Sequence, residues 1–174
     1  RPEVRLVRED RFRRWVAGPV WAAPEAAGIG PGDGAQWNIA RIRADEAWSA
    51  FGLDGSGITL AVLDTGADWQ HPALIGAYRG YKPGGLVIHE GNWICTTDEG
   101  YLYPVDGNGH GTHVTGTAVG GDDGSGMRIG VAPGARWIAA KMLDDQGYGY
   151  ESWIHAAFEW VLSPAVDPSL APQI

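Results

Sequence analysis

The spacing of apolar residues predicts several short β-strands. Residues 58–63 (Ile-Thr-Leu-Ala-Val-Leu) form an almost wholly apolar run, as expected of a strand that is buried on both faces. Residues 137–143 have the same character and are predicted as another strand. A shorter strand is expected at 86–88, followed by a long irregular stretch over 89–105.

Helical periodicity appears between these runs. Apolar positions within 42–51 recur at helical intervals until Gly52, and a second amphipathic pattern over 153–162 ends before Pro164. A further helix is expected to begin near His110, in a segment whose small residues permit close packing. Strands that alternate with helices predict an α/β fold with a parallel sheet.

Composition divides the chain into three regions. Residues 17–36 are rich in Ala, Gly and Pro, a composition that buries little apolar surface and is typical of a linker. The linker separates a charge-rich, strand-like segment, 1–16, from the folded domain expected over 37–174.

Length and charge exclude several classes of protein. A chain of 174 residues, 44% of them hydrophobic, suits a single domain with a real core. The net charge of −8 disfavours nucleic acid as a partner, because binding must neutralise phosphates. No apolar run approaches the roughly 20 residues that span a bilayer, so no membrane partner is expected. The single cysteine, Cys95, cannot form a disulfide within the chain.

Two residues could act together in acid–base chemistry. Asp64 directly follows the strand at 58–63, and His110 stands at the expected helix start. A carboxylate that accepts a proton from one imidazole nitrogen leaves the other free as a general base for a hydroxyl nucleophile. Two alternatives are a turn formed by Asp64 with Gly66, and a zinc site at His110 and His113, for which no further Cys/His cluster is present.

Three motifs, in order along the chain, resemble those of the subtilases, the subtilisin-like serine proteases. Residues 61–66 (Ala-Val-Leu-Asp-Thr-Gly) resemble the aspartate motif, and 110–116 (His-Gly-Thr-His-Val-Thr-Gly) resemble the histidine motif. Residues 130–134 resemble the turn after it, and the likeness covers about 37–162. Three short sequence segments look closest to the bacillopeptidase F subgroup, at 78–81, 134–138 and 159–162.

The resemblance implies the N-terminal part of a three-layer α/β subtilisin-like fold and a serine endopeptidase function on protein or peptide substrates. By the resemblance, Asp64 is the orienting carboxylate and His110 the general base of an Asp-His-Ser triad. Gly147, Tyr148 and Gly149 correspond to the extended segment that pairs with a substrate backbone. No cofactor is required for this chemistry.

The resemblance also implies maturation from a precursor. Residues 1–16 are similar to the end of an inhibitory propeptide, so the protein's own propeptide is an expected partner and 17–36 would hold the maturation site. Secretion follows from the family alone. Structural calcium is possible at Asp122 and Asp123, whose sequence context favours solvated turn residues instead.

The family's Gly-Thr-Ser nucleophile motif and oxyanion-hole asparagine do not occur in these 174 residues. The isolated chain is therefore expected to be inactive, as the N-terminal part of a longer protease. The alternative is a non-catalytic, truncated subtilase relative that binds peptides or a protease without cutting them.

Overall fold

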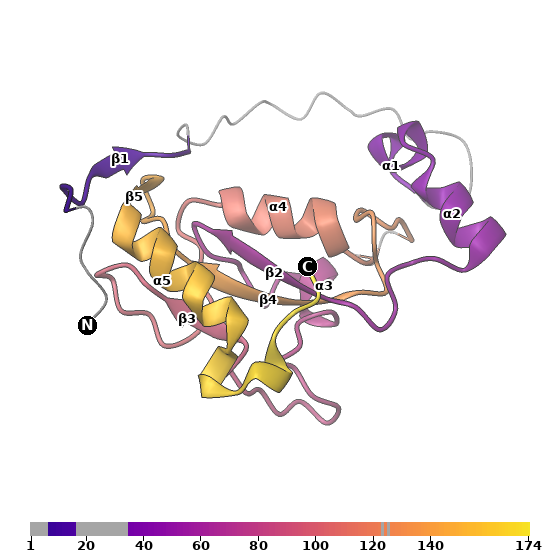
Figure 1. The fold of residues 1–174 in the computed structure, drawn as a ribbon. Coiled ribbons are helices and arrows are strands. Elements are labelled where there is room, and N and C mark those ends of the chain that lie inside the picture. Colours follow the sequence, from indigo (N-terminus) through magenta and orange to yellow (C-terminus); the bar gives the residue numbers. More distant parts are fainter. Residues whose placement is uncertain (1–6, 17–34, 123, 125) are drawn as a thin grey trace.

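Three parallel strands form the centre of the fold (Figure 1). In this computed structural model the strand order is β2 (Thr59–Asp64), β4 (Arg136–Lys141) and β3 (Trp93–Cys95). Lys141 pairs with Asp64 on one side and with Cys95 on the other, so all three strands end at the same edge of the sheet. The structure describes residues 7–16, 35–122, 124 and 126–174.

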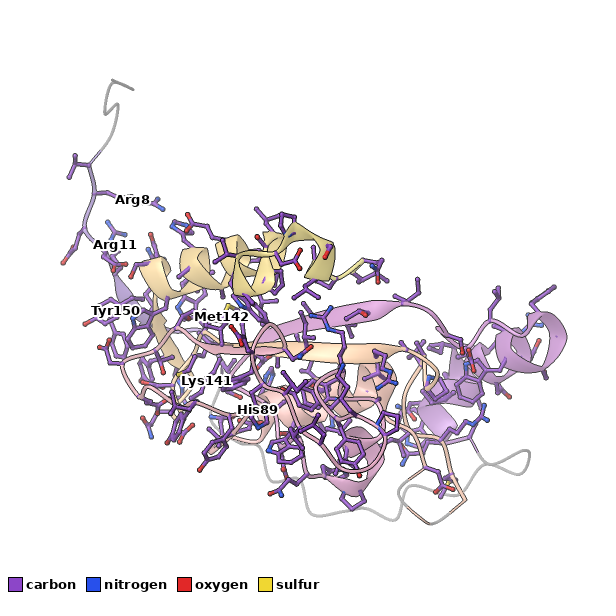
Figure 2. The ribbon with its side chains drawn as sticks, turned by 90° about the horizontal axis from the view of Figure 1, so that it is seen from below. Arg8, Arg11, His89, Lys141, Met142 and Tyr150 are labelled. Atoms are coloured by element: carbon purple, nitrogen blue, oxygen red, sulfur yellow. The ribbon has the colours of Figure 1, made fainter. Side chains whose placement is uncertain are left out.

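Helices cover both faces of this sheet. Figure 2 shows α5 (Glu151–Leu162) on one face of the strands, and α3 (Pro72–Ile75) and α4 (His110–Val119) on the other. The predicted three-layer α/β arrangement with a parallel sheet is confirmed. The strand expected at 58–63 and the helix expected from His110 form with nearly the predicted bounds.

The remaining elements are short. One helix expected over 42–51 corresponds to α2, which begins two residues later because Arg43 adopts a left-handed conformation (φ 62°) and separates it from α1. Gly52 ends α2 with a positive φ of 66°, as its sequence position predicts. The other bounds are α1 (Trp37–Arg41), β1 (Phe12–Arg14), β5 (Tyr148–Tyr150) and the 3₁₀ turns Pro164–Val166 and Pro168–Leu170.

The prediction between 86 and 105 is wrong. Val87 forms only an isolated bridge with Tyr81, whereas β3 forms at Trp93–Cys95, inside the stretch that was expected to be irregular. A strand of three residues is too short to show an alternating pattern. Its position depends on pairing with β4, which is a contact distant in sequence.

The core lies between the sheet and the layer of α3 and α4. Tyr78 and Trp137 are fully buried, with ring centroids 4.6 Å apart, and the Trp137 indole donates a hydrogen bond to the Leu74 carbonyl (2.9 Å). This packing fixes the sheet to α3, so the carboxyl ends of β2 and β4 are held on a rigid base.

Residues 173–174 lie along the edge of β2 that β4 leaves unpaired. The Ala61 amide donates to the Ile174 carbonyl (2.8 Å), and the Gln173 amide donates to the Thr59 carbonyl (3.0 Å). Within the described residues, none of the helices has the length and apolar character needed to cross a membrane.

Candidate active site

The structure brings Asp64 and His110 together at the carboxyl edge of the sheet. Asp64 is the last residue of β2 and His110 the first residue of α4, and His110 Nδ1 lies 2.7 Å from Asp64 Oδ1. The aspartate side chain is 12% exposed, whereas the imidazole is 43% exposed. The pair therefore has a buried carboxylate behind a ring that reaches solvent.

Proton positions in this pair follow from the chemistry of the two groups. An ionised carboxylate only accepts hydrogen bonds, so Nδ1 of His110 carries the proton and Nε2 keeps a free lone pair. The Thr65 amide also donates to Asp64 Oδ1 (2.7 Å), which holds the carboxylate in place. The arrangement can accept a proton at Nε2 and stabilise the imidazolium that results.

Two glycines allow the end of β2 to lie this close to α4 and to the loop that precedes α4. A Cβ atom at Gly111 would lie 2.0 Å from the Gly66 carbonyl oxygen, and one at Gly66 would lie 1.8 Å from the Val105 carbonyl oxygen. The Gly111 amide donates to the hydroxyl of the fully buried Thr65 (3.0 Å). The start of α4 is thus bonded directly to the end of β2, as the small residues near His110 led us to expect.

Sequence reasoning missed Asp106, which organises the loop before His110. Its Oδ2 accepts from the Thr112 amide (2.8 Å) and hydroxyl (2.7 Å), and its Oδ1 accepts from the Thr65 hydroxyl (2.8 Å) and the Gly109 amide (2.9 Å). Burial opposes ionisation of this group, but these hydrogen bonds together hold the pKa of Asp106 below its usual value. An aspartate shortly before a helix start was the available signal.

Lys141, at the end of β4, is a second residue that the sequence analysis did not identify. Its fully buried ammonium donates to the Thr65 carbonyl and to Asp145 Oδ1, both at 2.6 Å, and lies 3.2 Å from Glu99 Oε2. Burial disfavours the charge, but the carboxylates of Asp145 and Glu99 outweigh it and raise the pKa of Lys141. Figure 2 shows Lys141 toward the end of the molecule that carries Tyr150, below Met142.

The predicted substrate segment pairs with the N-terminal part of the chain. β5 and β1 form an antiparallel ladder in which Arg13 lies opposite Gly149. The Trp15 amide donates to the Gly147 carbonyl (2.8 Å), and the Trp15 indole donates to the Gly149 carbonyl (3.0 Å). Gly147 (φ 81°) approaches so closely that a Cβ there would lie 2.8 Å from the Val16 carbonyl oxygen.

The N-terminal segment runs toward His110 as it passes from residue 12 to residue 16. Residue 12 pairs with Tyr150, and residues 15 and 16 bond to Gly147, which is two residues from Asp145. Asp145 in turn accepts hydrogen bonds from Gly107 and Asn108, just before α4. Figure 1 shows β1 and β5 at the end of the molecule toward which the arrows of β2 and β4 point.

The structure provides no set of metal ligands for the zinc hypothesis or for the calcium hypothesis within its described residues. In the part of the chain that the structure describes, no three His, Cys, Asp or Glu side chains are grouped to hold an ion. Asp122 Oδ1 accepts from the amides of Gly124 and Gly126 (2.8 Å each), which is the geometry of a turn. Asp123 lies outside the described residues, and structural calcium stays a prediction.

Replacing Gly111 with alanine tests the close approach of α4 to β2. We expect Gly111→Ala to lower the free energy of unfolding by about 2–3 kcal/mol, because the new methyl group overlaps the rigid Gly66 carbonyl. The measurement is urea unfolding of the 174-residue chain.

The matched control is Gly116→Ala, in the same helix. There the nearest atom to a new Cβ, Ile129 Cδ1, is 3.8 Å away, and alanine's helix propensity predicts a gain of up to about 1 kcal/mol. Equal effects at the two positions would contradict the steric account.

Comparisons with known proteins identify the family of the chain. Residues 55–169 match the subtilase family, and the chain belongs to that family. It is 44% identical to Bacillopeptidase F of Bacillus subtilis (strain 168) over 149 residues, and 35% identical to Subtilisin E of the same strain over 131 residues. It is 38% identical to Subtilisin Savinase of Lederbergia lenta over 125 residues.

Coverage in these matches is unequal. They include 82%, 75% and 71% of this chain, but only 10%, 30% and 39% of the three relatives, respectively. The fold class and family resemblance predicted from sequence are confirmed. Subtilases are serine peptidases that act on protein or peptide substrates.

Proposed function

We propose that this chain supplies the aspartate and the histidine of a serine endopeptidase. The observation that carries the proposal is the 2.7 Å contact between Asp64 Oδ1 and His110 Nδ1, with the imidazole accessible to solvent. Membership of the subtilase family supports the reaction class. Of the residues described, Asp64 is the orienting carboxylate and His110 the general base.

The proposed reaction passes through an acyl-enzyme. His110 Nε2 accepts the hydroxyl proton of a serine as its oxygen attacks the peptide carbonyl, and Asp64 stabilises the imidazolium. His110 then donates the proton to the leaving amine, and the peptide C–N bond breaks. Water, deprotonated by His110 in the same way, releases the acyl group and regenerates the serine hydroxyl.

We propose that the serine is supplied from outside these 174 residues. Among the residues that the structure describes, no serine hydroxyl hydrogen-bonds to His110; those of Ser49, Ser152 and Ser169 donate to oxygens elsewhere. The described part of the isolated chain accordingly has the base but no positioned nucleophile, and we expect the chain to be inactive.

Residues 1–16 are proposed to be the end of an inhibitory propeptide. The pairing of β1 with β5 supports this, because the segment lies where a substrate backbone would pair. Maturation is proposed within 17–36, of which 17–34 lie outside the described residues. Secretion of the whole protein and structural calcium rest on family resemblance alone.

The test compares the 174-residue chain with the longer product of its reading frame. We expect the longer protein to hydrolyse peptides and to react with a serine-directed fluorophosphonate, and the short chain to do neither. Peptide hydrolysis by the short chain would overturn the proposed division of the triad. A longer protein that binds peptides but reacts with no probe would favour the non-catalytic alternative.

A further inference from the structure

An acidic side chain lies at the end of β5, the strand that pairs with β1. Glu151 is the first residue of α5 and directly follows β5. Its Oε1 accepts from Arg13 Nη2 (2.7 Å), and its Oε2 lies 3.0 Å from Arg8 Nη2. The glutamate side chain is only 16% exposed, so this carboxylate is largely withdrawn from water while both its oxygens face arginine.

The two faces of the β1 segment meet different surroundings. Phe12 packs on the rings of Tyr148 and Tyr150, with centroids 5.4 and 4.7 Å away. Arg13 lies opposite Gly149 in the ladder, and its guanidinium reaches Glu151. The surface therefore offers an aromatic contact at one position of a paired peptide and a negative charge at the next.

Within the described part of the chain, the Glu151 carboxylate has ion-pair partners only in the N-terminal segment. It bonds only to Arg8 and Arg13, both in the N-terminal segment. The nearby Asp10 carboxylate, which also belongs to this segment, accepts from the Ser152 amide (3.0 Å) and hydroxyl at the start of α5. Figure 2 shows the segment that carries Arg8 and Arg11 beside the first turn of this helix, near Tyr150.

We propose that Glu151 determines specificity by selecting an arginine side chain at the position that Arg13 occupies. The inference rests on the proposed protease function and names the substrate class of the same site: extended peptides with a basic residue at this position. When residues 8–13 leave β5, the Glu151 carboxylate loses both of its arginine partners. A peptide guanidinium restores them with charge-assisted hydrogen bonds, whereas a neutral residue does not and an acidic residue adds repulsion.

Charge exchange in the 174-residue chain tests the contact without any need for catalysis. In an Arg8→Gln background, which removes the second arginine, we expect Arg13→Glu and Glu151→Arg each to lower hydrogen-exchange protection of the Trp15 amide by about fivefold. The double variant Arg13→Glu/Glu151→Arg is expected to recover most of it. If the protection of the Trp15 amide stays as low in the double variant as in the single variants, the inference is overturned.

Arg11→Gln is the matched control. Arg11 lies in the same segment and has no ion pair in the described residues, so its replacement is expected to leave the Trp15 protection unchanged. A fivefold loss there would show that protection follows the net charge of the segment and not the contact with Glu151, and would overturn the inference.

Hydrolysis by the longer protein separates the inference from the function on which it rests. We expect kcat/KM for a peptide containing Phe-Arg-Arg-Trp to exceed that for Phe-Gln-Arg-Trp by about fivefold, and Glu151→Arg to favour Phe-Glu-Arg-Trp instead. Equal rates for all three peptides would overturn the inference and leave the protease function standing. Charge-dependent exchange without any hydrolysis would support the acidic site and overturn the protease function.

Discussion

Replacing His110 with alanine in the longer protein is expected to lower kcat for peptide hydrolysis by a factor on the order of 10³–10⁶. The upper figure is that found for subtilisin, a protein of the same family. The loss is this large because no other described side chain is paired with Asp64 to accept the serine proton. The measurement is steady-state hydrolysis of a peptide amide, with kcat and KM determined separately.

His113→Ala is the matched control for this experiment. His113 lies one turn further along α4, is exposed, and makes no hydrogen bond with Asp64. We expect kcat to stay within a few-fold of the original value. A His110→Ala protein that retains most of its activity, or a His113→Ala protein that loses it, would contradict the assignment of the general base.

The second large effect is expected on stability, for Lys141→Met. Removal of the ammonium leaves the Thr65 carbonyl without its donor, and Asp145 and Glu99 without their cation. We expect the free energy of unfolding to fall by about 3 kcal/mol. This is the lower end of the range for breaking a buried pair, because the two carboxylate side chains remain 25% and 26% exposed.

Arg43→Met is the control for Lys141→Met, since it removes a cation from an exposed pair. Arg43 and Glu46 have side chains that are 74% and 54% exposed. We expect no measurable change in urea unfolding of this variant, because solvent screens the pair. A Lys141→Met chain as stable as the original would show that the buried network does not stabilise the end of β4.

The elements that sequence predicted well are those whose signal is local. The apolar run at 58–63 is long enough to indicate β2, and Gly52 marks the end of α2 by its own conformational preference. α5 follows its amphipathic pattern but begins at Glu151, two residues before the predicted start. Its first turn bonds to Asp10, a partner distant in sequence that local periodicity does not reveal.

Candidate site residues divide in the same way. Asp64 and His110 were proposed from their places at a strand end and a helix start, and the structure puts them 2.7 Å apart. Lys141 was not singled out, because its role depends on Thr65, Asp145 and Glu99 meeting it in space. A lysine inside an apolar strand pattern was the available signal, since lysine is almost never fully buried unless it is paired.

The specificity proposed for Glu151 also could not be predicted from the sequence. An acidic residue in the first turn of a helix is common, because it interacts favourably with the helix dipole. Only the antiparallel register of β1 and β5 brings Arg13 to that carboxylate.

Nitrogen-15 NMR of the His110 ring in the 174-residue chain tests the central claim most directly. At a pH where the imidazole is neutral, the account predicts that Nδ1 carries the proton and Nε2 does not, because Asp64 accepts from Nδ1. Asp64→Ala should remove this preference. A ring protonated at Nε2 in the unaltered chain would contradict the claim that Asp64 prepares His110 to act as a base.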